Sequence, residues 1–407
     1  MKALVYVQHL LGIGHVRRTA AVVRALAQAG VEVTVAQGGR PVPDADFGAA
    51  RVVQLPPARV ADASFRPILD ESGRPVDDAW RARRAAALLG LEQRLRPDVL
   101  VVESFPFGRG AFRFELLPLI EAAAGRSPPA RIVSSVRDIL VAKDPARLAA
   151  MAELAARWFD LILVHGDPRF LPFDATFPHA GRLSGRLRYT GYVAGPRPPD
   201  ARGSDGADEI LVSAGGGAVG GPLLHAALEA ARAGAGGGRK WRLLAGAEMP
   251  EATRAALVAA APAHVVVERA RPDFPDLLSR CAVSVSQAGY NTVMDLMAAR
   301  CRSVLVPFSE GGETEQEVRA RLLARRGLAT LVEEARLDPA TLAAAVDRAL
   351  EAPPPRGSGF RMNGAAVAAR LIVSLVRRQP MPASRSGAPH PGTGKEIAEN
   401  ARLAGSG

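Results

Sequence analysis

The chain alternates short apolar runs with helix-like segments, and this alternation constrains its fold more than any other feature. Apolar runs at 4–8, 31–36 and 99–103 are separated by segments with helical periodicity. One of these segments, 15–29, stops at a helix-ending Gly30. Strands that alternate with helices in this way are typical of a parallel sheet covered by helices. The sequence therefore predicts an α/β fold.

The domain organisation follows from length and from one change in composition. A chain of 407 residues is long for a single hydrophobic core and fits two domains. A Pro- and Gly-rich stretch at 196–208 interrupts the alternation, which then restarts. We expect a Rossmann-like doubly wound domain at 1–195, a linker at 196–208, a second such domain at 209–378 and a disordered tail at 379–407.

Charge and cysteine content narrow the function classes. The net charge of +11 comes from scattered arginines, without the Lys/Arg runs interleaved with aromatics that nucleic-acid binding requires. The same charge suits anionic lipid headgroups or diphosphates. Cys281 and Cys301 are too few for a disulfide framework or a zinc site. No window approaches the ~18–20 apolar residues of a membrane helix. We expect a cytoplasmic protein, with peripheral contact at the inner face of the membrane as an alternative.

A glycine-rich turn follows the first expected strand of the second domain. It runs from Ser213 through Gly215, Gly216 and Gly217 to Gly220 and opens a helix. Glycines let a backbone approach phosphates, which helix N–H groups then face. The acidic residue that would bind the ribose of NAD about 20 residues later is missing. The turn predicts anion binding without a cofactor, and a turn with no ligand is the alternative.

A second glycine turn, at Gly289, precedes a helix whose first turns carry a hydroxyl and an acid. The Thr292 hydroxyl can face a phosphate at the helix N-terminus, and the Asp295 carboxylate can accept hydrogen bonds from ribose hydroxyls. Alternatively, Thr292 caps the helix and Asp295 interacts favourably with its dipole. Spacing alone does not choose between these interpretations.

The sequence Gly-Tyr-Asn-Thr-Val at this turn, within 289–329, resembles the donor-binding half of family 28 glycosyltransferases. Shorter motifs at 12–18, 136–139, 165–168 and 189–192 extend the likeness over most of the chain. The resemblance implies a GT-B fold, in which two Rossmann-like domains face a central cleft. It also implies an inverting, metal-independent transfer from a nucleotide-sugar donor, most simply a UDP-sugar, to an unknown acceptor. Acceptors in the family are often lipid-linked.

The resemblance also assigns roles to single residues. Asp295 falls on a ribose-binding glutamate, Gln316 on a glutamine that contacts the donor sugar, and Arg319 on an asparagine, which leaves the sugar open. Thr292 and Val293 fall beside the diphosphate. Backbone groups of the 271–274 loop fall at the edge of the base. The expected donor-binding residues are Gly14, Ser213, Gly215, Gly216, Gly217, Arg271, Phe274, Gly289, Asn291, Thr292, Val293, Asp295, Gln316 and Arg319.

His15 and Asp138 are the candidate bases. His15 aligns with the histidine of the family's Gly-Gly-His loop, and a near-neutral pKa suits proton removal from an acceptor hydroxyl. Asp138 ends an expected strand, where ligands bind in open α/β sheets, but it could instead pair with a neighbouring arginine. We rank Asp138 below His15. Glu103 and Asp167 occupy similar strand ends.

Three further alternatives stay open. A nucleotide-sugar 2-epimerase or hydrolase, or a non-catalytic sugar-nucleotide-binding protein, could share this two-domain fold and donor site.

The only Asp-x-Asp sequence, 44–46, lies in a Pro-flanked loop, so we expect no metal. The segment 79–95 combines arginines with Trp80 and could lie on a membrane, although we favour an ordinary surface helix that packs its leucines on the core.

Overall fold

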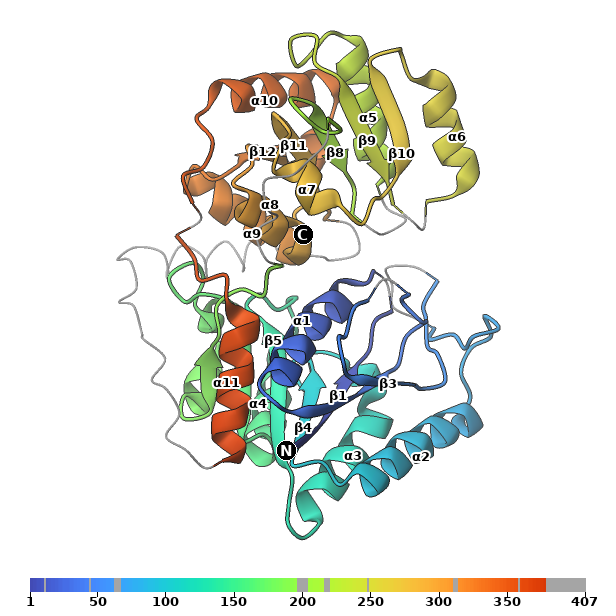
Figure 1. Cartoon of the computed structure of the whole chain (residues 1–407), viewed down its shortest axis with the longest axis vertical. Helices are drawn as coiled ribbons and strands as arrows, with labels where there is room; N and C mark the ends of the chain where they lie inside the picture. Colours follow the sequence, from blue (N-terminus) through green and yellow to red (C-terminus); the bar gives the residue numbers. More distant parts are fainter. Residues whose placement is uncertain are drawn as a thin grey trace. The chain divides into compact units, whose positions relative to one another are not determined.

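The computed structural model describes residues 1–10, 12–43, 45–61, 67–195, 204–215, 220–246, 249–309, 314–357 and 359–377. The chain forms two compact units (Figure 1). The first contains Met1–Ala194 together with the segment that begins at Phe360, and the second is Gly195–Gly359. Each unit is a parallel sheet covered by helices, which confirms the predicted α/β fold.

The first unit is built on a seven-stranded sheet in which every neighbouring pair is parallel. Its strands, in spatial order, are β3 (Arg51–Gln54), β2 (Glu32–Gln37), β1 (Lys2–Val7), β4 (Val99–Glu103), β5 (Arg131–Arg137), β6 (Leu161–His165) and β7 (Leu187–Tyr189). The chain order reverses between β1 and β4, which pair with Tyr6 opposite Val102. This pair is the switch point of the sheet, where open α/β folds bind ligands.

Helices and short 3-10 turns connect these strands. Helix α1 begins after a glycine turn in which Gly12 has φ +60°, and Gly30 with φ +78° follows its end. Its buried face repeats at helical spacing through Val16, Ala20 and Val23. The helices and turns of this unit are α1 (Gly14–Gln28), α2 (Asp78–Leu95), η1 (Gly110–Phe112), α3 (Arg113–Gly125), α4 (Pro145–Trp158), η2 (Phe173–Ala175), η3 (Ala180–Leu183) and α11 (Gly364–Val376).

Helix α11 belongs to the first unit, whereas the sequence predicts a second domain that extends to residue 378. The predicted boundary is therefore corrected. Its buried residues Ala368, Leu371 and Ile372 belong to the same hydrophobic core as α1. The chain just before it is hydrogen-bonded to the first unit, because Tyr192 N donates to Arg361 O at 2.7 Å. An apolar stripe in the sequence of a helix does not specify the sheet on which that stripe packs.

Helix α2 packs on the first unit as a surface helix. Asp77 caps its start by accepting a hydrogen bond from Trp80 N. Trp80 is 6% exposed and its ring lies 6.4 Å from that of Phe114. Leu88 and Leu91 are also buried. This arrangement matches the favoured interpretation of 79–95, and it leaves Trp80 unable to reach a membrane surface. Among the helices described, none combines the length and apolarity needed to cross a bilayer.

The second unit is built on a six-stranded parallel sheet. Its strands, in spatial order, are β10 (Val265–Arg269), β9 (Trp241–Ala245), β8 (Ile210–Ser213), β11 (Val283–Ser286), β12 (Ser303–Leu305) and β13 (Thr330–Leu331). Its helices and turn are α5 (Gly221–Arg232), α6 (Glu251–Ala260), α7 (Phe274–Leu278), α8 (Tyr290–Ala299), α9 (Glu315–Arg325), η5 (Glu334–Arg336) and α10 (Pro339–Glu351). Its switch point lies between β8 and β11, where Ser213 pairs with Ser286.

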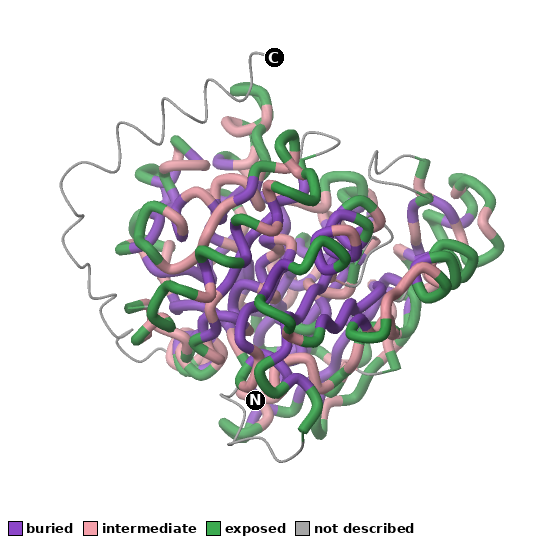
Figure 2. The backbone as a smooth tube through the Cα atoms, turned by 90° about the horizontal axis from the view of Figure 1, so that it is seen from above, coloured by how far each residue is buried: buried purple, intermediate pink, exposed green. Residues whose placement is uncertain are grey.

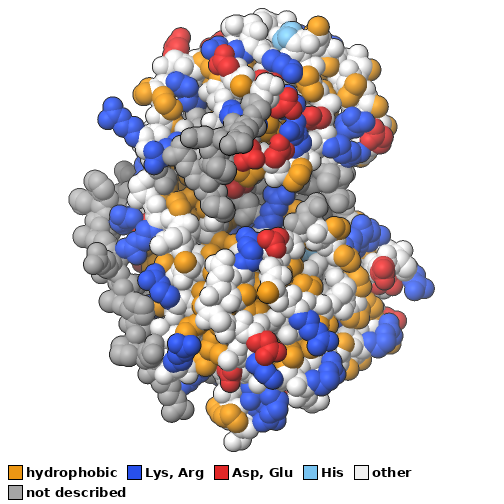
Figure 3. Space-filling view, viewed as in Figure 1, with side chains coloured by type: hydrophobic (Ala, Val, Ile, Leu, Met, Phe, Trp, Pro, Cys, Tyr) orange, Lys and Arg blue, Asp and Glu red, His pale blue; other side chains and the backbone are white. Residues whose placement is uncertain are grey.

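Burial and charge follow this architecture. Buried residues run along the central strands, while exposed residues lie on the outer helices and loops (Figure 2). On the face shown in Figure 3, Lys and Arg side chains are scattered over both units without forming a continuous stripe.

The packing of α11 yields a stability prediction. Replacing Ile372, which is 0% exposed, with alanine should lower the free energy of unfolding by about 2–5 kcal/mol, because it leaves a cavity under the helix. The exposed Arg370 on the same helix is the control, and its alanine variant should change stability by no more than about 0.5 kcal/mol. Denaturant unfolding with hydrogen exchange measures both. A loss of protection confined to β8 and β9, with β5 and β6 unaffected, would contradict the assignment of α11 to the first unit.

Candidate functional site

The switch point of the first unit brings a histidine and a glutamate together. His15 lies in the first turn of α1, which starts soon after β1, and Glu103 is the last residue of β4. Since β1 and β4 are parallel neighbours, both residues emerge at the same edge of the sheet. His15 Nδ1 lies 2.6 Å from Glu103 Oε1. The His15 side chain is 17% exposed and that of Glu103 1%, so the pair presents only its imidazole to solvent.

Three arginines surround this pair. Arg18, one turn along α1, contacts Glu103 Oε1, and the Arg109 Nε lies 3.9 Å from Glu103 Oε2. Arg137, the last residue of β5, contacts the other imidazole nitrogen, His15 Nε2. The Ser104 hydroxyl also donates to Glu103 Oε1, at 2.6 Å. We call His15, Glu103, Arg18, Arg109 and Arg137 the basic cluster.

The basic cluster fixes the protonation states of its two central residues. Burial, together with the positive charges of Arg137 and Arg109, holds the pKa of His15 well below its usual 6.5, although Glu103 acts in the opposite direction. Burial alone would raise the pKa of Glu103, but its contacts with His15, Arg18 and Arg109 lower it below its ordinary range. At neutral pH the imidazole is therefore neutral and the carboxylate is ionised. Such an imidazole donates from Nδ1 and accepts at Nε2.

Asp138, the second candidate base, is buried in the first unit. The residue is 0% exposed. Its Oδ2 accepts a hydrogen bond from the Tyr192 hydroxyl at 2.6 Å, and its Oδ1 accepts one from Ile139 N at 3.0 Å. The expectation that this carboxylate points into the crevice is therefore wrong, because the chain turns it inward to bind Tyr192 in the core.

Sequence reasoning assigned no role to most of the basic cluster. Glu103 was noticed as a strand-end carboxylate but was not chosen over Asp138, and the three arginines were not singled out. The available signal was position: β4 and β5 both end in a charged residue, Glu103 and Arg137. Which strand lies beside β1 could not be obtained from those positions alone.

The switch point of the second unit carries the two glycine turns. Ser213 ends β8, and its backbone carbonyl accepts a hydrogen bond from Gln287 N, just after β11, at 3.4 Å. The Ser213 hydroxyl accepts from Gly215 N at 3.3 Å, and Gly215 has φ +73°, which favours glycine. Gly216 and Gly217 lie outside the described residues. The turns at Gly215 and Gly289 therefore open from adjacent strands at one edge of the sheet.

Helix α8 starts directly after the second turn with an uncapped end. Gly289 occupies the N-cap position, and no side chain caps the first turn, so Thr292 is not the capping residue. Val293 N is already hydrogen-bonded to Gly289 O at 3.0 Å, and the residue is 1% exposed. The preceding backbone N–H groups are those that this helix end can present to an anion. Asn291, Thr292 and Asp295 are all half-buried.

Two expected sugar contacts, Arg319 and Gln316, make hydrogen bonds within the second unit. Arg319 is 0% exposed, and its guanidinium donates to Glu315 Oε1 at 2.7 Å and to the Ala288 carbonyl at 3.2 Å. It also lies over the ring of Tyr290, 5.5 Å from the ring centroid. Through these contacts Arg319 supports the start of α8 from inside the second unit. Gln316 is half-buried and accepts from Phe308 N at 3.2 Å, which uses one face of its amide.

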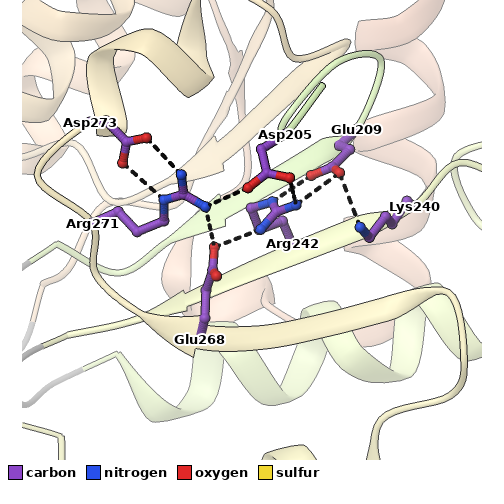
Figure 4. Close-up of polar contacts among 7 residues, drawn as sticks. All are labelled: Asp205, Glu209, Lys240, Arg242, Glu268, Arg271 and Asp273. Carbon is purple, nitrogen blue, oxygen red and sulfur yellow. Dashed lines mark hydrogen bonds and ion pairs between the residues drawn. The ribbon is translucent and has the colours of Figure 1, made fainter. Parts of the chain in front are cut away.

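The 271–274 loop is held by a network of ion pairs (Figure 4). Arg271 contacts both carboxylate oxygens of Asp273, at 2.9 and 2.7 Å, and also Asp205 at 2.9 Å. Arg242 on β9 bridges Glu209 and Glu268, at 2.6 and 2.8 Å. The Arg271 side chain is therefore engaged with carboxylates, and Phe274 is half-buried. Gly14, the remaining expected donor contact, begins α1 of the first unit.

Among the residues that the structure describes, no group of three or more His, Cys, Asp or Glu side chains is placed to hold a metal ion.

The chain is similar to known glycosyltransferases over different spans. Residues 255–370 match the glycosyltransferase family 28 C-terminal domain. The UDP-N-acetylglucosamine--N-acetylmuramyl-(pentapeptide) pyrophosphoryl-undecaprenol N-acetylglucosamine transferase of Aromatoleum aromaticum is 31% identical over 266 residues. That match covers 64% of this chain and 66% of the relative, which is just under two thirds of its length.

Two solved structures share the fold. MurG of Acinetobacter baumannii has a TM-score of 0.53 at 17% identity, over 93% of this chain and 100% of that one. The glycosyltransferase SnogD from Streptomyces nogalater has a TM-score of 0.56 at 21% identity, over 99% and 98%. Residues 255–370 are thus similar to the glycosyltransferase family 28 C-terminal domain, and the chain as a whole has the GT-B fold of the glycosyltransferases it resembles.

Proposed function

We propose that this protein transfers a sugar from a UDP-sugar to an acceptor hydroxyl, with inversion at the anomeric carbon and without a metal ion. The observation that carries the proposal is that each unit has groups suited to catalysis or anion binding at its switch point. One holds a neutral histidine oriented by a carboxylate, and the other holds an uncapped helix end beside a glycine turn. The relatives are glycosyltransferases, so we favour transfer over epimerisation, hydrolysis or sugar-nucleotide binding without catalysis.

The second unit supplies the donor site in this proposal. The first N–H groups of α8 and the turn at Gly215 receive the diphosphate, because both present backbone at the same sheet edge. Asp295, one turn into α8, accepts hydrogen bonds from the ribose hydroxyls. The backbone of 271–274 meets the edge of the uracil, and its position depends on the ion pairs of Arg271. Asn291, Thr292 and Gln316 remain candidates for contacts with the phosphates and the sugar.

The first unit supplies the base. His15 Nε2 takes the proton from the acceptor hydroxyl as its oxygen attacks the anomeric carbon. The bond from that carbon to the UDP oxygen breaks, and UDP leaves from the opposite face, which inverts the configuration. Glu103 holds the imidazole through Nδ1 and stabilises the imidazolium that forms. Backbone N–H groups and positive side chains stabilise the leaving diphosphate, in place of a cation.

The acceptor class is also part of the proposal. The Aromatoleum relative is named for acting on a pyrophosphoryl-undecaprenol lipid. We infer a lipid-linked acceptor for this chain, met at the cytoplasmic face of a membrane through a peripheral contact. The guanidinium groups of the basic cluster are of the chemical type that binds an acceptor carrying phosphate.

The donor site is tested by nucleotide binding. Asp295→Ala should weaken UDP binding by about 1–3 kcal/mol, the cost of losing a hydrogen bond to a charged group. Glu351→Ala, at the exposed end of α10, is the matched control and should bind UDP as the native protein does. Isothermal titration calorimetry with UDP, TDP, GDP and ADP measures the affinity and the preference for the base. Equal affinity in both variants would remove Asp295 from the donor site.

The base is tested by the pH dependence of transfer. His15→Ala should lower kcat by about 10²–10⁴-fold while leaving UDP affinity intact, and the exposed His225→Ala is the control. Because the pKa of His15 is depressed, the acid limb of kcat/KM should have its midpoint below pH 6.5. Glu103→Gln should move that limb to still lower pH, since Glu103 raises the pKa of His15. An acid limb that Glu103→Gln does not move would argue against the pair.

Metal independence is tested with a chelator. UDP release that depends on acceptor should continue in excess EDTA, because helix N–H groups and arginines stabilise the leaving group. Loss of the activity in EDTA, with recovery on adding magnesium or manganese, would contradict this part of the proposal.

A further inference from the structure

The two cysteines of the chain lie against each other in the second unit. Cys281 and Cys301 are 20 positions apart in the sequence, and both are free thiols. Their Sγ atoms are 3.2 Å apart. Cys281 comes just before β11, and Cys301 lies between α8 and β12. A bond between the two sulfur atoms therefore requires them to approach each other by only about 1 Å.

The two thiols differ in how easily a reagent can reach them. Cys281 is half-buried, whereas Cys301 is only 5% exposed. Cys281 Sγ donates to the Leu278 carbonyl at 3.5 Å. Cys301 Sγ donates to the Arg302 carbonyl at 3.0 Å. A small reagent from solvent meets Cys281 first, and Cys301 is placed behind it to react second.

The chain between the cysteines carries the helix of the proposed donor site. It contains β11, the turn at Gly289 and α8, in that order. Cys281 precedes the amino end of β11, whereas the Gly289 turn follows its carboxyl end. A bond between Cys281 and Cys301 would thus close this strand, turn and helix into one covalent loop, at the end of the strand away from the Gly289 turn.

We propose that Cys281 and Cys301 form a reversible disulfide that clamps the segment 281–301, with a peroxide as the oxidant. The Cys281 thiolate attacks one oxygen of hydrogen peroxide, the O–O bond breaks and hydroxide leaves, which gives a sulfenic acid. The Cys301 thiol then attacks the Cys281 sulfur, and the sulfenic oxygen leaves as water. Two electrons pass from the thiols to the peroxide, and a dithiol reductant reverses the change.

The protonation state of Cys281 sets the rate of the first step. The hydrogen bond with Cys301, burial and the negative charge of Glu209 raise the pKa of Cys281 well above its usual value. The thiolate is the reactive form, so oxidation should be slow at neutral pH. Its rate should rise roughly tenfold for each pH unit below that pKa, because the thiolate fraction grows in the same proportion.

Peptide mapping of the full-length protein tests whether the bond forms. The reduced protein is treated with hydrogen peroxide at pH 9, its remaining thiols are blocked in denaturant, and it is digested with trypsin. Trypsin cleaves after Arg280, Arg300 and Arg302, so peptide 281–300 should appear joined to the dipeptide 301–302. Dithiothreitol should separate the two. Absence of the joined peptides from the treated native protein would overturn the proposal.

Single serine variants test the order of the two steps. Cys301→Ser lacks the second thiol, so its Cys281 should remain a sulfenic acid that dimedone captures. In Cys281→Ser, treated in the same way, Cys301 should stay unmodified because it is buried. Capture by dimedone at Cys301 but not at Cys281 would contradict the proposed entry through Cys281.

Thermal unfolding and hydrogen exchange test the clamp. A disulfide restricts the unfolded chain, so oxidation should raise the unfolding midpoint of the second unit by roughly 5–10 °C and slow exchange in α8. Dithiothreitol should return both to their starting values, and peroxide-treated Cys281→Ser is the control that should show neither change. An unchanged midpoint in protein that carries the bond would overturn the clamp. None of these readouts involves sugar transfer, so the inference is independent of the proposed function.

Discussion

Parallel pairing at the two switch points is the constraint on which the rest of this structure depends. In a parallel sheet all strands end at the same edge, so the segments that follow neighbouring strands must open side by side. Pairing of β1 with β4 places His15 beside Glu103, and pairing of β8 with β11 places Gly215 near Gly289. The sites are thus products of backbone hydrogen bonding and strand order, and the side chains supply the chemistry.

The two units use buried charge in different ways. In the first, burial together with the positive charges of Arg137 and Arg109 lowers the pKa of His15, while Glu103 acts in the opposite direction. In the second, the two arginines and the lysine of the Figure 4 network face four carboxylates, those of Asp205, Glu209, Glu268 and Asp273. Ion pairs of this kind fix the position of a loop, whereas a buried histidine beside a carboxylate is suited to proton transfer.

Individual residues show where sequence reasoning reached its limit. Asp138 and Glu103 both lie at strand ends and could not be ranked by position, yet one is turned into the core by Tyr192 and the other faces His15. Arg319 follows Gln316 at a spacing that suits one helix face, but its side chain supports α8 from inside. In each case the direction of the side chain depends on a partner that is distant in sequence.

The sequence by itself determined the α/β class, the helix and strand alternation and the family resemblance at 289–329. These features are local, because periodicity and glycine turns act over a few residues. Only the tertiary structure decided that α11 joins the first unit, that Glu103 orients His15, and that Arg137 covers its basic nitrogen. Those outcomes depend on which strands become neighbours and on which charges are then buried together, and neither is encoded in the spacing of residues along the chain.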